Sequence, residues 1–137
     1  MTRLVEESFV VTLHEEERVL EVVYPARITL AAFEKYREDM LATIPKLEAG
    51  GKWHCLVDQS RISATMSPDM PPRIADLVAW SLEHGMDRVA RIVSPSELGR
   101  MQTGRILRAA GVGESAMLFQ DREAAWAFVA GSNEESS

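Results

Sequence analysis

The chain has 137 residues, a formal net charge of -6, and 46% hydrophobic and 26% charged residues. These proportions are typical of one globular domain, which we expect over residues 1–130, followed by a disordered acidic tail over 131–137. An acidic chain is a poor match for nucleic acid, whose phosphates are bound by basic surfaces. The single cysteine, Cys55, leaves no pair for an internal disulfide and no Cys-based zinc site.

The beginning of the chain indicates its location. Residues 1–7 carry acids where a secretion signal needs an apolar core. No apolar run is long enough to cross a bilayer. We therefore expect a cytoplasmic protein without stable membrane insertion.

Two β-rich runs open the chain, over residues 9–13 and 18–24, and the short polar connection between them predicts a hairpin. Thr29 is a good N-cap for the first helix. Pro45 is expected to end or kink that helix. Its apolar face is predicted at helical spacing from Leu30, Phe33, Met40, Leu41 and Ile44.

The second half alternates strand and helix three times. Apolar strands are predicted over residues 53–57, 89–93 and 116–119. The helices that follow them begin near Pro72, at Pro95 and after Asp121, with Gly85 and Gly111 as helix ends. We therefore expect an α/β domain, with a five-stranded mixed sheet built from an N-terminal hairpin and then βα units. About four helices should lie mainly on one face, joined by right-handed crossovers.

Several segments share a pattern with a known family. Residues 119–128, Phe-Gln-Asp-Arg-Glu-Ala-Ala-Trp-Ala-Phe, combine a strand-end aromatic, an acidic cap and a helix of alanines and aromatics. Residues 89–93, before a Ser/Pro-led helix, and residues 26–29, before the first helix, fit the same pattern. Over residues 9–130 the chain resembles the SpoIIAA-like family, relatives of the STAS domains of anti-sigma-factor antagonists.

The resemblance implies a non-enzymatic regulatory module that docks partner proteins. Many STAS proteins are switched by phosphorylation of a serine at the start of the helix after the third strand. Asp58-Gln59-Ser60 looks like the strand-end Asp-x-Ser of that pattern, and Ser67 falls near the switch position. Met66-Ser67-Pro68-Asp69 stands where the family has Asp-Ser-Ser-Gly, so Ser67 also fits a helix cap or a plain loop serine.

The long polar connection over residues 59–70 is the strongest candidate for a working surface, because function concentrates in long loops on rigid scaffolds. Met66 and Met70 are expected to be exposed there, beside the start of the second helix. The occupant would be a protein partner or a second copy of the chain, as a homodimer. The residues expected on this surface are Ser60, Met66, Met70 and Trp80.

A rival interpretation is a carrier for a small apolar or amphipathic, lipid-like ligand, since distant relatives of the fold bind such molecules. A carrier would need an enclosed apolar pocket on the order of a few hundred cubic ångströms between the helices and the sheet. The sequence predicts no catalytic residues, since no base and nucleophile support each other, and no cofactor.

Other polar residues have a structural interpretation beside a functional one. Ser94, Ser96 and Arg100 would form an anion site at a helix N-terminus, unless Ser94 and Glu97 simply cap that helix. Cys55, in an apolar run, is expected to be a buried small hydrophobe.

The three histidines, His14, His54 and His84, are too scattered for a metal site, so we expect no metal and structural roles for them. A group of arginines makes the region around the third helix basic. It is either a docking face for an acidic partner or a solvated helix surface. Its members are Arg88, Arg91, Arg100, Arg105 and Arg108.

Overall fold

The computed structural model describes residues 8–63, 66–93 and 116–131. The predicted helix that begins at Pro95 and the acidic tail beyond Gly131 lie outside these residues. The described elements, in chain order, are β1 (Val10–His14), β2 (Val19–Val23), α2 (Leu30–Glu48), β3 (Trp53–Asp58), α3 (Met70–Glu83), β4 (Met86–Ile92), β5 (Ala116–Phe119) and α5 (Arg122–Ala130).

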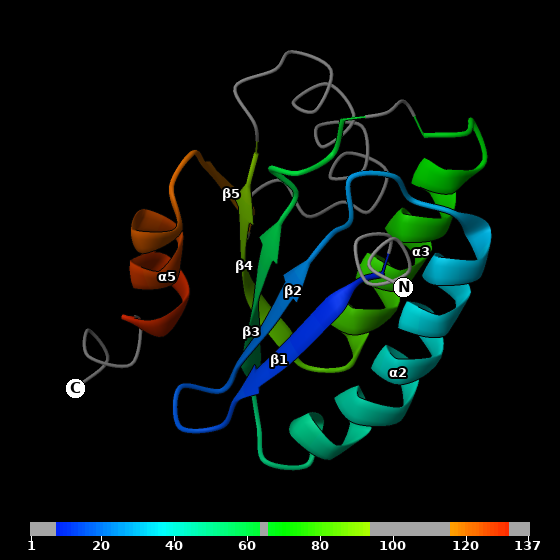
Figure 1. The fold of residues 1–137 in the computed structure, drawn as a ribbon. Helices are drawn as coiled ribbons and strands as arrows, with labels where there is room; N and C mark the ends of the chain where they lie inside the picture. The colour runs from blue at the N-terminus through cyan, green and yellow to red at the C-terminus, as the bar shows by residue number, and fades with distance from the viewer. Residues whose placement is uncertain (1–7, 64–65, 94–115, 132–137) are drawn as a thin grey trace.

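The strands form one mixed sheet in the order β1-β2-β3-β4-β5. β1 runs antiparallel to β2, and the other neighbouring pairs are parallel. The expected α/β domain with an N-terminal hairpin is therefore confirmed. Three helices, rather than about four, fall within the described residues. α2 and α3 cover one face of the sheet, as predicted, and α5 covers the other (Figure 1).

Each face of the sheet has its own apolar core. The larger core lies under α2 and α3 and includes Leu20, Phe33, Ile44, Trp53 and Ile74. The smaller lies under α5 and includes Val19, Leu56, Ala90, Ala125 and Val129. Successive residues of a strand point to opposite faces, so the central strands are buried on both sides. Each large apolar side chain removed from water stabilises the fold by about 1.5–3 kcal/mol.

α2 begins where the sequence predicts, because the Thr29 Oγ1 accepts a hydrogen bond of 3.1 Å from the Ala32 amide. Leu30 is 49% exposed, so it does not belong to the buried face, which instead includes Tyr36 and Leu47. Of the two effects expected of Pro45, ending or kinking the helix, the first is wrong, since α2 continues to Glu48. A proline near a helix end removes one amide donor, and its own carbonyl still accepts from the Ala49 amide at 3.2 Å.

Arg18 connects the hairpin to the far end of α2. Its Nε donates to the Lys52 carbonyl at 2.8 Å, and its Nη2 donates to the carbonyls of Leu47 and Gly51. Its own backbone is left-handed, with φ of 57°, while its carbonyl accepts from the His54 amide at 2.9 Å. One side chain thus satisfies carbonyls at the end of α2 and in the turn before β3.

We expect Arg18→Ala to lower the free energy of unfolding by about 1–3 kcal/mol, because these carbonyls lose a charged donor. Denaturant unfolding monitored by circular dichroism measures the change. Arg37→Ala on the exposed side of α2 is the control and should stay close to the unsubstituted chain. Equal stability of the two variants would contradict the role given to Arg18.

Candidate functional site

Polar side chains gather where the parallel strands end. Tyr24 follows β2, Gln59 follows β3, and Arg91 lies one residue before the end of β4. The backbone aligns these strand ends, since the Tyr24 amide donates to the Asp58 carbonyl at 2.9 Å and the Gln59 amide donates to the Ile92 carbonyl at 2.8 Å. Ligands of open α/β sheets bind at this carboxyl edge of the strands.

Arg91 is the unusual member of this cluster because it is 1% exposed. Its Nη1 donates to the Gln59 Oε1 at 3.1 Å, and the guanidinium also hydrogen-bonds to the Tyr24 hydroxyl. Its Nε has no hydrogen-bond partner among the described residues. Within the described residues no carboxylate lies at ion-pair distance from it. A guanidinium stays charged in proteins, so this is a buried cation without a counter-charge in the described part of the chain. The expectation that Arg91 lies on a solvated helix surface is wrong, because it faces the core on β4.

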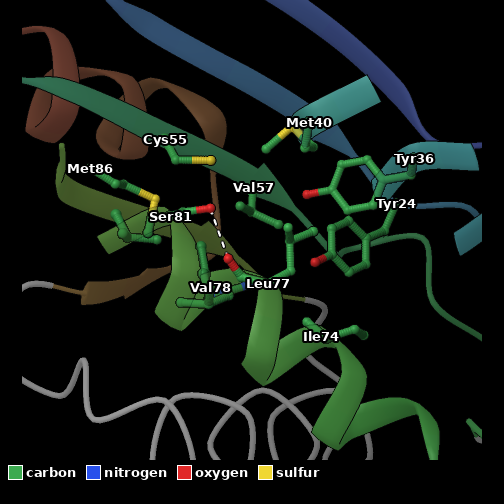
Figure 2. Close-up of a pocket in the computed structure, with 12 residues that line it drawn as sticks. Tyr24, Tyr36, Met40, Cys55, Val57, Ile74, Leu77, Val78, Ser81 and Met86 are labelled. Atoms are coloured by element: carbon green, nitrogen blue, oxygen red, sulfur yellow. Dashed lines mark hydrogen bonds between the residues drawn. The ribbon is translucent and has the colours of Figure 1, made fainter. Parts of the chain in front are cut away.

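The Arg91 side chain lines a cavity between the sheet and the two helices α2 and α3. The space left for water-sized molecules is about 20 Å³, which suits about one water. The hydroxyl ends of Tyr24 and Tyr36 turn toward the same side of the cavity (Figure 2). The remaining lining residues are Met40, Cys55, Val57, Ile74, Leu77, Val78, Ser81, Met86 and Val89.

The cavity holds neutral donors beside one cation. Burial raises the pKa of Tyr24, and that of Tyr36 well above its usual range, while the nearby Arg91 guanidinium opposes both rises. Both phenols therefore keep their protons at neutral pH and are able to donate hydrogen bonds. The Ser81 hydroxyl donates to the Leu77 carbonyl at 2.8 Å, within α3. The cavity thus combines one cation with neutral hydroxyls in an otherwise apolar wall.

Cys55 lies in the wall of this cavity and is buried, as the sequence predicts. Burial raises the pKa of its thiol to about 12. The thiolate, which is the nucleophilic form, is therefore scarce at neutral pH. Cys55 contributes volume and polarisability to the wall.

The loop after β3 turns back against the chain that follows β2. The Ser63 amide donates to the Ala26 carbonyl at 3.0 Å, which holds the loop against the chain after β2. The prediction that Met66 and Met70 are exposed is wrong, since they are 7% and 2% exposed and belong to the larger core. Once the loop turns inward, their apolar side chains are removed from water.

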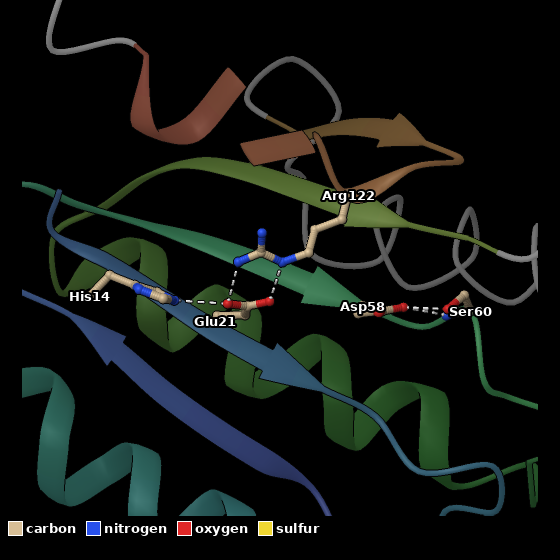
Figure 3. Close-up of polar contacts among 5 residues, drawn as sticks. All are labelled: His14, Glu21, Asp58, Ser60 and Arg122. Atoms are coloured by element: carbon tan, nitrogen blue, oxygen red, sulfur yellow. Dashed lines mark hydrogen bonds and ion pairs between the residues drawn. The ribbon is translucent and has the colours of Figure 1, made fainter. Parts of the chain in front are cut away.

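The predicted serines of this loop do lie at the surface. The Ser60 amide and hydroxyl both donate to the Asp58 Oδ1, at 2.9 and 2.6 Å (Figure 3). The Ser67 hydroxyl donates to the Asp69 Oδ1 at 2.7 Å. Asp69, and not Ser67, occupies the N-cap position of α3, and its side chain accepts no cap hydrogen bond. Of the two structural readings of Ser67, the loop serine is therefore the correct one.

Trp80 does not join these residues. It lies near the other end of α3, about 15 Å from Met70 at 1.5 Å per residue. Its ring stacks on that of His84, with 4.0 Å between centroids. The predicted surface of Ser60, Met66, Met70 and Trp80 is thus not one patch. Ser94, Ser96 and Arg100, the predicted anion site, lie outside the described residues, as do Arg105 and Arg108.

The histidines have local partners. The His54 Nδ1 accepts from the Arg88 amide at 3.1 Å, and His84 Nδ1 lies 2.7 Å from the Trp80 carbonyl. Burial lowers the pKa of His54. Across residues 8–63, 66–93 and 116–131, no three His, Cys, Asp or Glu residues are grouped closely enough to hold a metal ion.

A second polar cluster, on the α5 side of the sheet, shows how this chain pairs an arginine with a carboxylate. Arg122 meets Glu21 side-on, with Nε–Oε2 at 2.8 Å and Nη2–Oε1 at 2.9 Å (Figure 3). His14 Nε2 lies 2.8 Å from the same carboxylate. The hydrogen bond from Arg122 is the main cause of a lowered pKa at Glu21. The charges of Glu21 and Arg122 are therefore paired within the cluster, which connects α5 to β1 and β2.

No protein-family model matches this chain, and no match is found among curated proteins or solved structures. The resemblance to SpoIIAA-like proteins therefore stays a prediction. Within the residues that the structure describes, no helix combines the length and apolar character needed to cross a membrane.

Sequence reasoning missed Arg91 as a site residue, although a signal was present. Arg91 interrupts the apolar run over residues 89–93 and shares the parity of Val89, so it points to the same face of the strand. An arginine with that placement is buried whenever the strand is covered on both sides.

We expect Arg91→Met to raise the free energy of unfolding of the ligand-free protein by about 1–3 kcal/mol, because methionine fills similar space without a buried charge. Denaturant unfolding measures it. The matched control is Arg88→Met on the same strand, where the guanidinium donates to the Phe128 carbonyl and lies 5.2 Å from its ring centroid. Arg88→Met should lower stability. A larger loss in Arg91→Met than in Arg88→Met would contradict our account of the buried charge.

Proposed function

We propose that this chain is a non-enzymatic binding module that takes a small anionic, amphipathic ligand in the cavity beside Arg91. The observation that carries the proposal is a guanidinium that is 1% exposed, lacks a carboxylate among the described residues and lines a cavity. A buried charge without a partner costs several kcal/mol, and a bound anion would offset that cost.

The surroundings of Arg91 support a ligand with an apolar part. Apart from Arg91, the described lining residues carry no charge at neutral pH, and most of them are aliphatic or sulfur-containing. The cavity is much smaller than the pocket of a lipid carrier, at about 20 Å³ for water-sized molecules. We therefore propose a small molecule in place of the lipid-like ligand that the sequence suggests.

The proposal is compatible with a regulatory role of the SpoIIAA-like kind in the cytoplasm. An N-terminal antiparallel hairpin followed by parallel βα units supports the proposed STAS-like fold. Its fourth helix would be the one predicted from Pro95. In that role, binding of the ligand would change the regulatory state of the module.

We expect small monovalent anions such as formate, acetate or nitrate to raise the melting temperature of the protein in a saturable way. Ligand at 100 times its Kd stabilises a protein by about 2.7 kcal/mol. Differential scanning fluorimetry measures the shift, with ionic strength held constant by a bulky sulfonate salt. Arg88→Met should respond like the unsubstituted chain and Arg91→Met should not. The absence of any anion-dependent shift in the unsubstituted chain would contradict the proposal.

A second candidate function, docking of a protein partner or a second copy, is favoured by the exposure of Ser67 in the turn before α3. A phosphate there would lie close to a helix N-terminus, which attracts negative charge. Ser60 lies exposed on the same loop. The buried Met66 and Met70 would not contribute to this surface.

For this second function we expect Ser67→Asp to change the recovery of a specific co-purified protein, or the fraction of dimer, several-fold. Quantitative mass spectrometry of affinity-purified protein and sedimentation velocity measure these two quantities. Ser63→Asp, another exposed serine of the loop, is the matched control. Identical recovery and identical sedimentation of both variants would remove the phosphorylation switch.

A further inference from the structure

We infer that the ligand of the Arg91 cavity is a small monocarboxylate, bound side-on by the guanidinium, with a short apolar substituent along the methionine side of the wall. This inference rests on the proposed function and goes further, because it names the chemical class of the ligand. Three observations lead to it: the Arg91 Nε has no described hydrogen-bond partner, Arg91 is the one charged residue among the described cavity residues, and the cavity is small and mostly apolar.

The geometry of the Arg91 guanidinium favours a carboxylate as the anionic group of the ligand. Nη1 of Arg91 is occupied by Gln59, and the atom without a partner is Nε. The edge that contains Nε is the one with which a guanidinium meets a carboxylate side-on. Arg122 uses this edge on Glu21, at 2.8 and 2.9 Å. The Arg122–Glu21 pair therefore shows, in the same chain, the side-on contact with a carboxylate that Arg91 does not make with any described residue.

The charge balance favours a monoanion. Arg91 is the one charged residue among the described side chains that line the cavity. A carboxylate would neutralise it, whereas a phosphate or sulfate dianion would leave a net negative charge in a poorly solvated space. The hydroxyls of Tyr24 and Tyr36 stay neutral, because burial raises the pKa of both, and they hydrogen-bond to each other beside Arg91.

The size of the cavity limits the rest of the ligand. The free space of about 20 Å³ excludes a long chain unless the wall moves. Met40 and Met86 are the most adaptable members of that wall, since unbranched thioethers repack readily. Acetate and propionate are larger than one water, so either would enter only if these side chains were displaced.

The test is a titration of the full chain, labelled with ¹³C at the methionine methyls, with acetate, propionate and octanoate at constant ionic strength. We expect saturable shifts of the Met40 and Met86 methyls and none at Met117, which is 46% exposed on β5. Propionate should bind at least about tenfold more tightly than propionamide or sulfate, as one charged bidentate contact predicts. Octanoate should bind more weakly than propionate.

Variants locate the contact and separate the two proposals. Arg91→Lys keeps the charge without the planar edge and should lose the preference for propionate over nitrate, whereas Arg88→Met should keep it. Nitrate binding with no preference for carboxylates in the unsubstituted chain would overturn this inference and leave the proposed function standing. Shifts confined to Met117, or propionate shifts that persist unchanged in Arg91→Met, would also overturn it. No response to any anion would overturn both proposals.

Discussion

The central strands of the sheet are covered on both faces, and this constraint governs the rest of the molecule. α2 and α3 pack on one side and α5 on the other, so most residues in β2, β3 and β4 are buried. An apolar residue in such a strand contributes to one of the two cores. A charged residue there loses its hydration and needs a partner inside the protein. Arg91 is the residue at which this constraint carries the proposed function.

Two arginines of this chain illustrate alternative solutions to the same electrostatic problem. Arg122 is half exposed and meets Glu21 side-on, while His14 contacts the same carboxylate. Arg91 is buried, and its described hydrogen-bond partners, the Gln59 amide oxygen and the Tyr24 hydroxyl, are both neutral. The first arrangement is complete in itself and holds α5 against the sheet. We propose that an anion bound in the cavity would complete the second.

The loop after β3 has a buried side and an exposed side. Met66 and Ile62 bury their side chains in the core, and Ser60 and Ser67 stay exposed on the same loop. The loop begins at Gln59, which accepts a hydrogen bond from Arg91. The two proposed functions are compatible, since one concerns the cavity beside Arg91 and the other the exposed side of this loop.

The sequence by itself determined the elements and their order. Local signals were sufficient for this: Thr29 and Asp121 cap helices through their own side chains, Gly85 adopts a left-handed backbone after α3, and the apolar runs become strands. Pro45 suggests a helix end, but α2 continues past it. A proline near a helix end costs one hydrogen bond, and the packing of α2 outweighs that cost.

Only the tertiary structure decided which polar and sulfur-containing side chains are hidden. Exposure depends on what packs over a residue, and that partner comes from a distant part of the chain. Met66 and Met70 look exposed in a polar loop until the loop folds inward, and Trp80 looks close to them until α3 separates them. Arg91 looks like one of several basic surface residues until α2, α3 and the sheet enclose it. The elements are local properties of the chain, whereas the candidate site arises from the meeting of strand ends that are far apart in sequence.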